Sequence, residues 1–305
     1  MGTLIAKSTL LLAINIAIAL GYTTYLDTQR DYAPWETGSA LYQIPKQEHC
    51  PYLFIGSSHM GVFRRCPDNV DAVHDATGTD VQFIAKLGSG IFQHHHFLRE
   101  FYRRGNSADA IVCFIDPFAF YSAHWNETMR FIESEPLDLT FLLDLYRSGV
   151  APDTLHRYVR SKYRGDWFNK KPSQFNRMMC DKQLEKRVPF EGRLVRHFYP
   201  QGTQHAKLAH YMRELRLFIE TAQSHDTHLI LIEPPTLLGT LPDIDHYRAA
   251  LQESISQYDV DYYDLSESIP DIYLYRNHDH LNDAGVQHFL TNYLAPILTK
   301  TPGSR

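Results

Sequence analysis

The stretch LFIGSSHMGVF, residues 53–63, joins an apolar run to a glycine, two serines and a histidine. The run PYLFIG (51–56) is typical of a short buried strand. Gly56 allows the chain to turn tightly after that strand, and the residues that follow predict a helix. Ser57 and Ser58 then lie at the start of this helix. There they either cap it or present a nucleophile beside free backbone N–H groups.

Four further runs have the composition of buried strands: VQFIAKLG (81–88), DAIVCFIDP (109–117), THLILIEPP (227–235) and VDYYDLS (260–266). Segments with helical periodicity separate most of them. Strands that alternate with helices predict an α/β fold in three layers, with a mainly parallel sheet covered on both faces.

The predicted α/β domain spans residues 49–300 and contains an insertion at about 125–200. The alternation breaks in this insertion, where two helical segments, TFLLDLYRSG and TLHRYVRSKYR, lie among irregular polar sequence. Residues 27–48 contain scattered prolines and polar residues and are predicted to form a linker. Long insertions of this kind usually carry lids or binding surfaces.

The segment STLLLAINIAIALGYTTYL (8–26) carries no charged side chain. About 20 such residues suffice for a transmembrane helix, and Lys7 before the segment favours a cytoplasmic N-terminus. Residues 1–26 therefore predict a single-pass anchor in the cytoplasmic membrane with a periplasmic main domain. A cleaved signal peptide is the alternative, and a buried soluble helix is a third. The first two alternatives both place the main domain outside the cytoplasm.

Charge and cysteine spacing argue against several classes of site. The net charge of −5 gives no support to a nucleic-acid partner. There is no Cys-x-x-Cys pair, so a cysteine-based zinc site is not expected. His94, His95 and His96 are consecutive in a predicted helix, where successive side chains point about 100° apart and cannot converge on one ion. We therefore expect neither a metal nor a cofactor.

The stretch YRNHDHLNDAG (275–285) lies between the last strand and the final helix, for which Asn282 is the predicted N-cap. Loops at the carboxyl ends of parallel strands share one edge of the sheet. His280 is therefore expected to lie beside Ser58 and to act as the base that a serine nucleophile needs. His278 is interpreted as a surface residue.

The block Gly56-Ser57-Ser58-His59 after a strand, with His280-Leu281-Asn282 before a C-terminal helix, resembles the SGNH/GDSL hydrolase superfamily. Within it, the predicted anchored layout is similar to bacterial envelope proteins related to the D-alanine transfer protein of lipoteichoic acid synthesis. The resemblance covers residues 49–116 and 203–299 and excludes the insertion. It implies a flavodoxin-like sheet, serine acyl or ester chemistry, and O-acylation or deacylation of cell-surface glycans.

Matched to the motifs of this superfamily, Ser58 stands at the position of the nucleophile, with Ser57 as the fallback. His280 stands at the position of the general base. The resemblance also implies an oxyanion glycine after the second strand, for which Gly90 is the first candidate and Gly88 the second.

The chain departs from the superfamily pattern in two places. The family has an aspartate three residues before the histidine, where this chain has Asn277. An amide oxygen can orient an imidazole but adds no charge. The third catalytic group could therefore be Asn277 or the adjacent Asp279, or be absent, which would leave a Ser-His dyad. The asparagine after the third strand is also missing. Asp116 stands at that position and is a candidate for the oxyanion and substrate site. Asn126 is a remote candidate for the missing asparagine.

These features predict extracytoplasmic acyl transfer or ester hydrolysis on a cell-surface glycan or lipid-linked substrate, through a covalent acyl-serine. A membrane-bound partner that donates the acyl group is expected. The alternative is a catalytically impaired accessory or glycan-binding protein of an envelope polysaccharide modification system that kept the fold.

Overall fold

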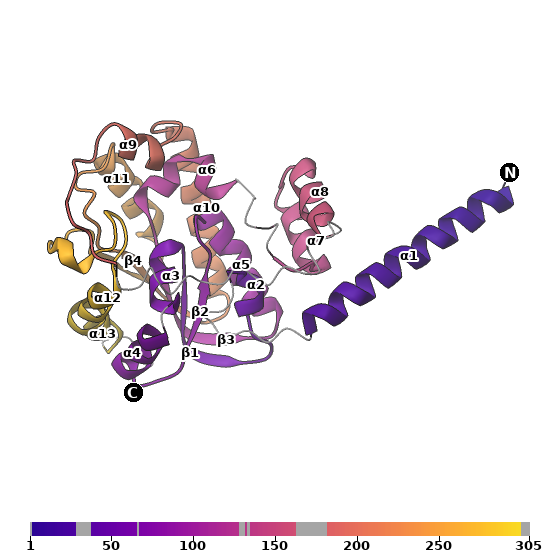
Figure 1. Ribbon diagram of the computed structural model, residues 1–305, viewed down its shortest axis with the longest axis horizontal. Helices are drawn as coiled ribbons and strands as arrows, with labels where there is room; N and C mark the ends of the chain where they lie inside the picture. The colour runs from indigo at the N-terminus through magenta and orange to yellow at the C-terminus, as the bar shows by residue number, and fades with distance from the viewer. Residues whose placement is uncertain are drawn as a thin grey trace.

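The computed structural model describes residues 2–28, 38–65, 67–127, 132, 135–162 and 182–299. In Figure 1 these residues form an α/β body from which the N-terminal helix α1 (Gly2–Thr28) projects.

Five parallel strands form the centre of the body in the order β2-β1-β3-β4-β5. Their bounds are β1 His49–Gly56, β2 Val81–Ala85, β3 Ser107–Phe114, β4 His228–Glu233 and β5 Val260–Asp264. The register pairs Gly56 with Ala85 and Phe114 with Ile232, so the strands end together at one edge. The prediction of an α/β fold with a parallel sheet is confirmed.

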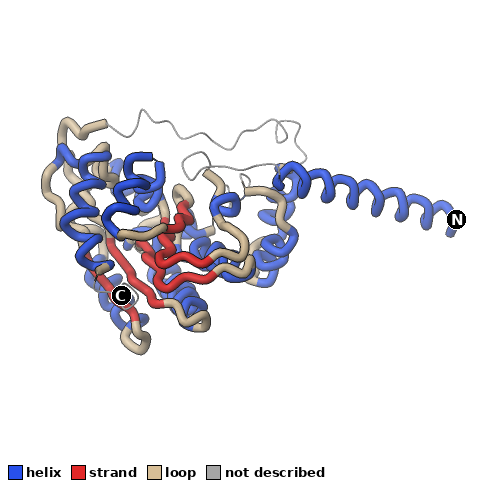
Figure 2. Tube along the Cα trace, turned by 90° about the horizontal axis from the view of Figure 1, so that it is seen from below, coloured by secondary structure: helices blue, strands red, loops and turns tan. Residues whose placement is uncertain are grey.

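Helices cover both faces of this sheet, as Figure 2 shows with strands in red and helices in blue. One face carries α2 (Ala40–Gln43), α5 (Ile91–Arg103), α10 (His205–Gln223) and α11 (Ile244–Ile255). The other carries α3 (Ser58–Arg65), α4 (Pro67–Thr77), α12 (Asp283–Phe289), the π-helical η5 (Leu290–Leu294) and α13 (Ala295–Leu298).

The alternation of side chains along the strands separates two apolar cores. In β1, Leu53 and Ile55 belong to the core under α5 and α10, whereas Phe54 belongs to the core under α3 and α12. Successive strand side chains point to opposite faces, and all three are fully buried. A strand buried on both faces therefore reads in the sequence as a continuous apolar run.

The predicted insertion begins near η1 (Pro117–Tyr121) and α6 (Ala123–Asn126) and contains α7 (Leu139–Arg147), α8 (Pro152–Ser161) and α9 (Arg193–Phe198). The two segments expected to be helical are α7 and α8. Phe141 and Leu145 of α7 are buried and join the core beside α5.

Residues 38–48 were predicted to belong to a linker, but in the structure they pack against the body. Ala40, Leu41 and Ile44 are buried. The buried carboxylate of Glu135 accepts hydrogen bonds from the backbone N–H groups of Ala40 and Leu41 and pairs with Lys86 at 2.6 Å. Prolines and polar residues suggested a linker, but this carboxylate, distant in the sequence, holds the segment in place.

Helix α1 contains much of the predicted anchor, and the side chains described from Ile5 to Ile18 are exposed. Among the described residues, however, no helix combines the length and the apolar character that crossing a membrane requires. The predicted transmembrane helix is therefore not supported. Cys66 and Cys180 lie outside the described residues, and Cys50 and Cys113 are free thiols.

Candidate active site

Ser58 and His280 meet at the carboxyl edge of the sheet. Ser58 is the first residue of α3, directly after β1 and Ser57, and His280 lies in the loop before α12. The Oγ atom of Ser58 is 2.7 Å from Nε2 of His280. The two loops predicted to lie side by side, 222 residues apart in the sequence, are thus in hydrogen-bond contact.

Asn277 orients the imidazole of His280 from its other side. Its Oδ1 lies 3.0 Å from His280 Nδ1 and also accepts the backbone N–H groups of Asp279 and His280 at 3.0 and 2.8 Å. An atom that accepts two N–H groups must be the amide oxygen, so Nδ1 of His280 carries its proton. Nε2 is then the free acceptor for the Ser58 hydroxyl, which is the tautomer a general base requires.

The loop that carries Asn277 and His280 is closed at its base. Tyr275 and Leu281 form an antiparallel bridge, and the N–H of Arg276 donates to the carbonyl of His280 at 3.0 Å. Asn282 caps α12, as predicted, by accepting from the N–H of Gly285. Its amide also donates to Tyr273, in the short helix η4 (Ile272–Leu274). These contacts fix the distance between Asn277 and His280.

His59 lies behind the Ser58–His280 pair, between two buried carboxylates. Its Nε2 is 3.1 Å from Asp279 Oδ1 and 3.5 Å from Asp116 Oδ1, and its ring centre is 4.9 Å from that of His280. The contact with Asp279 is not aligned as a hydrogen bond, so it acts as an ion pair.

The charges in this cluster compensate one another. Burial disfavours charge on His59, but Asp116 and Asp279 outweigh it and raise the pKa of His59 to about 9. Burial likewise disfavours charge on Asp279, but His59 and His280 hold the pKa of Asp279 at about 2. The pKa of Asp116 is raised, chiefly by burial. At neutral pH His59 is therefore a cation between two acidic groups.

Asp279 does not make the direct hydrogen bond to the catalytic imidazole. Its Oδ2 is 3.7 Å from His280 Nδ1, beyond the 3.0 Å contact that Asn277 makes. Asp279 therefore contributes negative charge near His280 while Asn277 fixes the ring.

Ser57 lies in a different environment from Ser58. It is 3 % exposed, and its hydroxyl donates to Asp116 Oδ2 at 2.6 Å. Asp116 follows β3, so this bond ties the end of β1 to the neighbouring strand. The Ser57 hydroxyl thus bonds Asp116, whereas the Ser58 hydroxyl is the one bonded to His280 Nε2.

Gly90 is the N-cap of α5, and its backbone N–H donates to Gln93 Oε1 at 2.8 Å. The amide of Asn126 donates to the carbonyls of Ala119 and Ser122, and its Oδ1 accepts from Phe92. In this arrangement neither Gly90 nor Asn126 offers the oxyanion donor that the resemblance implies. The backbone N–H of Ser58 lies in the first turn of α3, where helix N–H groups have no partner within the helix.

His59, Asp279 and His280 are the group among the described residues whose ligand atoms lie close enough to hold a metal ion, all within 4.8 Å of one another. His280 already uses both ring nitrogens, toward Ser58 and Asn277. An ion at this place would have to displace the Ser58 hydroxyl from Nε2 or the Asn277 oxygen from Nδ1.

The three consecutive histidines of α5 have separate partners. His94 contacts Ser89, His95 contacts Glu214 and Thr221, and His96 contacts Asp144. All three are buried.

Comparisons with known proteins give a likeness in fold alone. No family model matches the chain, and no curated protein is similar in sequence. Among solved structures, the chain is similar to a candidate acylhydrolase from Bacteroides fragilis, with 11% identity, a TM-score of 0.44, and coverage of 87% of this chain and 94% of the other. It is also similar to a variant of an acetylxylan esterase from Geobacillus stearothermophilus, with 12% identity, a TM-score of 0.39, and coverage of 86% and 99%. At these scores the likeness carries no weight in assigning an activity.

Two residues of the site escape the sequence interpretation. His59 follows Ser58 directly, yet nothing in the sequence shows that Asp116 and Asp279 converge on it. The role of Gln93 could have been predicted, because a glutamine three residues after an N-cap residue commonly accepts a hydrogen bond from the N–H of that residue.

Proposed function

We propose that this protein is a serine-dependent esterase or acyltransferase of the SGNH/GDSL type. The observation that carries the proposal is the contact of Ser58 with His280 Nε2 at 2.7 Å, with Asn277 holding the opposite nitrogen. A hydroxyl, a base in the correct tautomer and a group that orients the base are the elements of nucleophilic acyl transfer.

The chemistry follows from this geometry. Ser58 Oγ attacks the ester carbonyl while its proton passes to His280 Nε2, and an oxyanion forms on the carbonyl oxygen. The Ser58 N–H is the proposed donor to that oxyanion, an interaction worth several kcal/mol of barrier. The carbon–oxygen bond of the ester then breaks, and the leaving alkoxide takes the proton from Nε2. Water or a sugar hydroxyl then gives its proton to the same nitrogen and attacks the acyl carbon. The bond from that carbon to Ser58 Oγ breaks, and Ser58 Oγ takes the proton back from Nε2.

The experiment is covalent labelling of the full chain with a fluorophosphonate probe, followed by mass spectrometry of the labelled peptide. We expect the label on Ser58, and its loss in the Ser58→Ala and His280→Ala variants. Ser57→Ala is the matched control and should still be labelled. A folded wild-type chain that takes no label, or a label that persists in Ser58→Ala, would refute the proposal.

A non-catalytic accessory or glycan-binding protein is the second candidate. The observation that favours it is that both predicted oxyanion donors are engaged elsewhere. The N–H of Gly90 donates to Gln93, and the amide of Asn126 donates to backbone carbonyls. A site without these donors stabilises an oxyanion less well. An unlabelled Ser58 in a chain that binds glycan would favour this candidate.

We further propose that the protein works outside the cytoplasm, on a cell-surface glycan or lipid-linked ester, with a membrane-bound partner supplying acyl groups. The support is the sequence of residues 1–26, with Lys7 before a charge-free apolar segment. Protease accessibility in intact spheroplasts, together with the mass of the mature N-terminus, tests the location. Protection from protease in intact spheroplasts would contradict it.

A further inference from the structure

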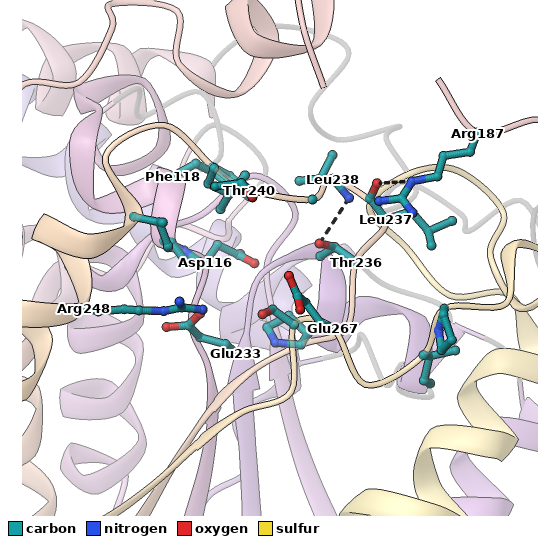
Figure 3. A pocket seen from close by; sticks show the side chains of 18 residues that line it. Asp116, Phe118, Arg187, Glu233, Thr236, Leu237, Leu238, Thr240, Arg248 and Glu267 are labelled. Atoms are coloured by element: carbon teal, nitrogen blue, oxygen red, sulfur yellow. Dashed lines mark hydrogen bonds between the residues drawn. The ribbon is translucent and has the colours of Figure 1, made fainter. Parts of the chain in front are cut away.

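Two hollows of the molecule differ in their linings. A cavity of about 370 Å³ lies beside the candidate active site, and Figure 3 shows charged side chains on its walls, among them Asp116, Glu233 and Arg248. Asp116 also accepts from Ser57 and contacts His59, so this cavity belongs to the candidate active site. The second hollow is a groove between α7 and α8 of the insertion, and its lining is almost entirely apolar.

The groove has a volume of about 680 Å³. We refer to its apolar lining as the α7–α8 face, which consists of Leu139, Leu142, Leu143 and Tyr146 of α7 with Leu155 and Val159 of α8. Within this face Leu139 is 53 % exposed, Leu143 44 % and Tyr146 64 %. Contiguous apolar surface that stays in contact with water marks an interaction site, because covering it is favourable.

Helix α7 is apolar on two sides. Phe141 and Leu145, one turn apart, are buried and join the core beside α5. Leu139, Leu143 and Tyr146 follow a second line with helical spacing and remain exposed. A helix that packs on one core needs a single apolar side. Packing of the body therefore explains the first side of α7 and leaves the second for an outside contact.

The charges around the α7–α8 face favour an anionic surface. The exposed charged side chains of the two helices are Arg147, Arg157, Arg160 and Asp153. Arg147 follows Leu143 by one turn, so it lies at the border of the groove. Arg160 follows His156, which also lines the groove, by one turn and lies at the border in the same way.

A cationic pocket adjoins the groove, because Leu143 lines both. The pocket has a volume of about 450 Å³, and its charged residues are Arg99, Arg103, Arg147, Glu100 and Asp144. Ion pairs join Arg99 to Asp144 and Arg103 to Glu100. The charge of Arg147 is then the surplus in this pocket. An apolar groove beside a cationic pocket matches the two parts of an anionic phospholipid, its acyl chains and its phosphate.

The position of α1 favours a lipid surface over a protein partner. Figure 1 shows α7 and α8 on the side of the body from which α1 projects. Helix α1 exposes apolar side chains that include Leu10, Leu11 and Ile18. Two separate apolar elements on one side of the body suit an extended surface that can cover both.

We propose that the α7–α8 face docks on the surface of a membrane that contains anionic phospholipid. Leu139, Leu143 and Tyr146 enter the boundary between head groups and acyl chains, a level at which tyrosine is enriched. Arg147 and Arg160 lie at the level of the lipid phosphates. The contact requires neither a membrane-spanning α1 nor the proposed catalysis. It sets which side of the α/β body faces the membrane.

The test exposes the full chain to vesicles of phosphatidylglycerol and phosphatidylcholine in equal parts, with a trace of photoactivatable phosphatidylglycerol. Mass spectrometry locates the lipid adducts, and their yield per mole of chain is measured below lipid saturation. We expect adducts on peptides that cover residues 139–160. Leu143→Asp and Tyr146→Asp should each lower this yield at least about tenfold, because a charge replaces a buried apolar group.

Tyr273→Asp is the matched control. Tyr273 is 60 % exposed, close to the value for Tyr146, and lies in η4, whose neighbours Ile272 and Leu274 pack on the opposite core. Its yield of adducts on residues 139–160 should equal that of the wild type, and thermal unfolding checks that each variant is folded. Arg147→Glu/Arg160→Glu, or vesicles of phosphatidylcholine alone, should reduce the yield at least roughly fivefold. Inorganic phosphate should not compete.

Four results would overturn the proposal. They are the absence of adducts on residues 139–160, an unchanged yield in both aspartate variants of α7, equal labelling by vesicles of phosphatidylcholine alone, and competition by inorganic phosphate. A dimer seen by analytical ultracentrifugation and lost in Tyr146→Asp, with no lipid adducts, would assign the face to a second copy of this chain. Fluorophosphonate labelling of Ser58 tests the proposed function separately, because docking of the α7–α8 face does not involve that residue.

Discussion

The side-chain oxygen of Asn277 is 3.0 Å from His280 Nδ1 and accepts two backbone N–H groups of the same loop. One neutral amide thus folds the loop and sets the tautomer of the base. A carboxylate at this position would do both and would also stabilise the imidazolium that forms when Ser58 is deprotonated.

Asn277→Ala should lower kcat/KM for an aryl acetate by roughly 10²-fold, because the ring of His280 loses its orienting acceptor. Asn277→Asp keeps an oxygen at the same place and adds charge, so its kcat should equal or exceed that of the wild type. Steady-state kinetics of both variants, with thermal unfolding as the folding control, makes the comparison. Equal activity in Asn277→Ala would show that Asn277 does not position the base.

Substituting the two serines should affect different properties. Ser57→Ala leaves the buried Asp116 Oδ2 without its donor and should reduce the free energy of unfolding by about 1–3 kcal/mol. Ser58→Ala should change stability by less than about 1 kcal/mol and abolish turnover. Urea unfolding and ester hydrolysis of each variant give the two readouts. A stable, inactive Ser57→Ala would instead identify Ser57 as the nucleophile.

The buried His59 predicts a pH dependence of stability. Its pKa is about 9 in the folded chain, above its ordinary value of 6.5. The stabilising contribution is therefore complete below pH 6.5 and is lost as the pH rises through about 9. The free energy of unfolding, from urea titrations, should fall across this window.

His59→Gln should remove that fall, because no cation remains to be titrated between Asp116 and Asp279. It should also cost about 3–5 kcal/mol near neutral pH, since two buried acidic groups lose their counter-ion. An unchanged slope in His59→Gln would mean that another group produces the pH dependence.

Gly90→Ala should destabilise the fold by about 1–3 kcal/mol through crowding. A Cβ at Gly90 would collide with the side-chain amide of the buried Asn126, although the backbone angles of Gly90 suit any residue. Removing the obstructing side chain in Gly90→Ala/Asn126→Ala should make the double variant less destabilised than the sum of the single ones. Strict additivity of the unfolding free energies would contradict this contact.

Metal removal tests the role of the His59, Asp279 and His280 cluster. The proposed mechanism needs no ion, so EDTA should leave ester hydrolysis unchanged. Added Zn²⁺ should inhibit, because it would compete with Ser58 or Asn277 for a ring nitrogen of His280, and EDTA should restore the rate. Loss of activity on EDTA treatment alone would point to a metal-dependent mechanism.

The sequence by itself determined the alternation of strands and helices, because strands buried on both faces appear as apolar runs and the helices between them keep their periodicity. It also placed Ser58 and His280 at one edge, since the carboxyl ends of parallel strands meet there. It could not show the conformation of residues 38–48, whose burial depends on the distant Glu135.

Only the tertiary structure decided how the other polar groups pair. Gly90 and Asn126 engage Gln93 and backbone carbonyls, and His59 of helix α3 joins Asp116 and Asp279 from two separate loops. Hydrogen bonds and ion pairs form over about 3 Å, whereas sequence periodicity fixes only which side of an element a residue faces. Which polar groups come within that distance is set by packing of the whole chain.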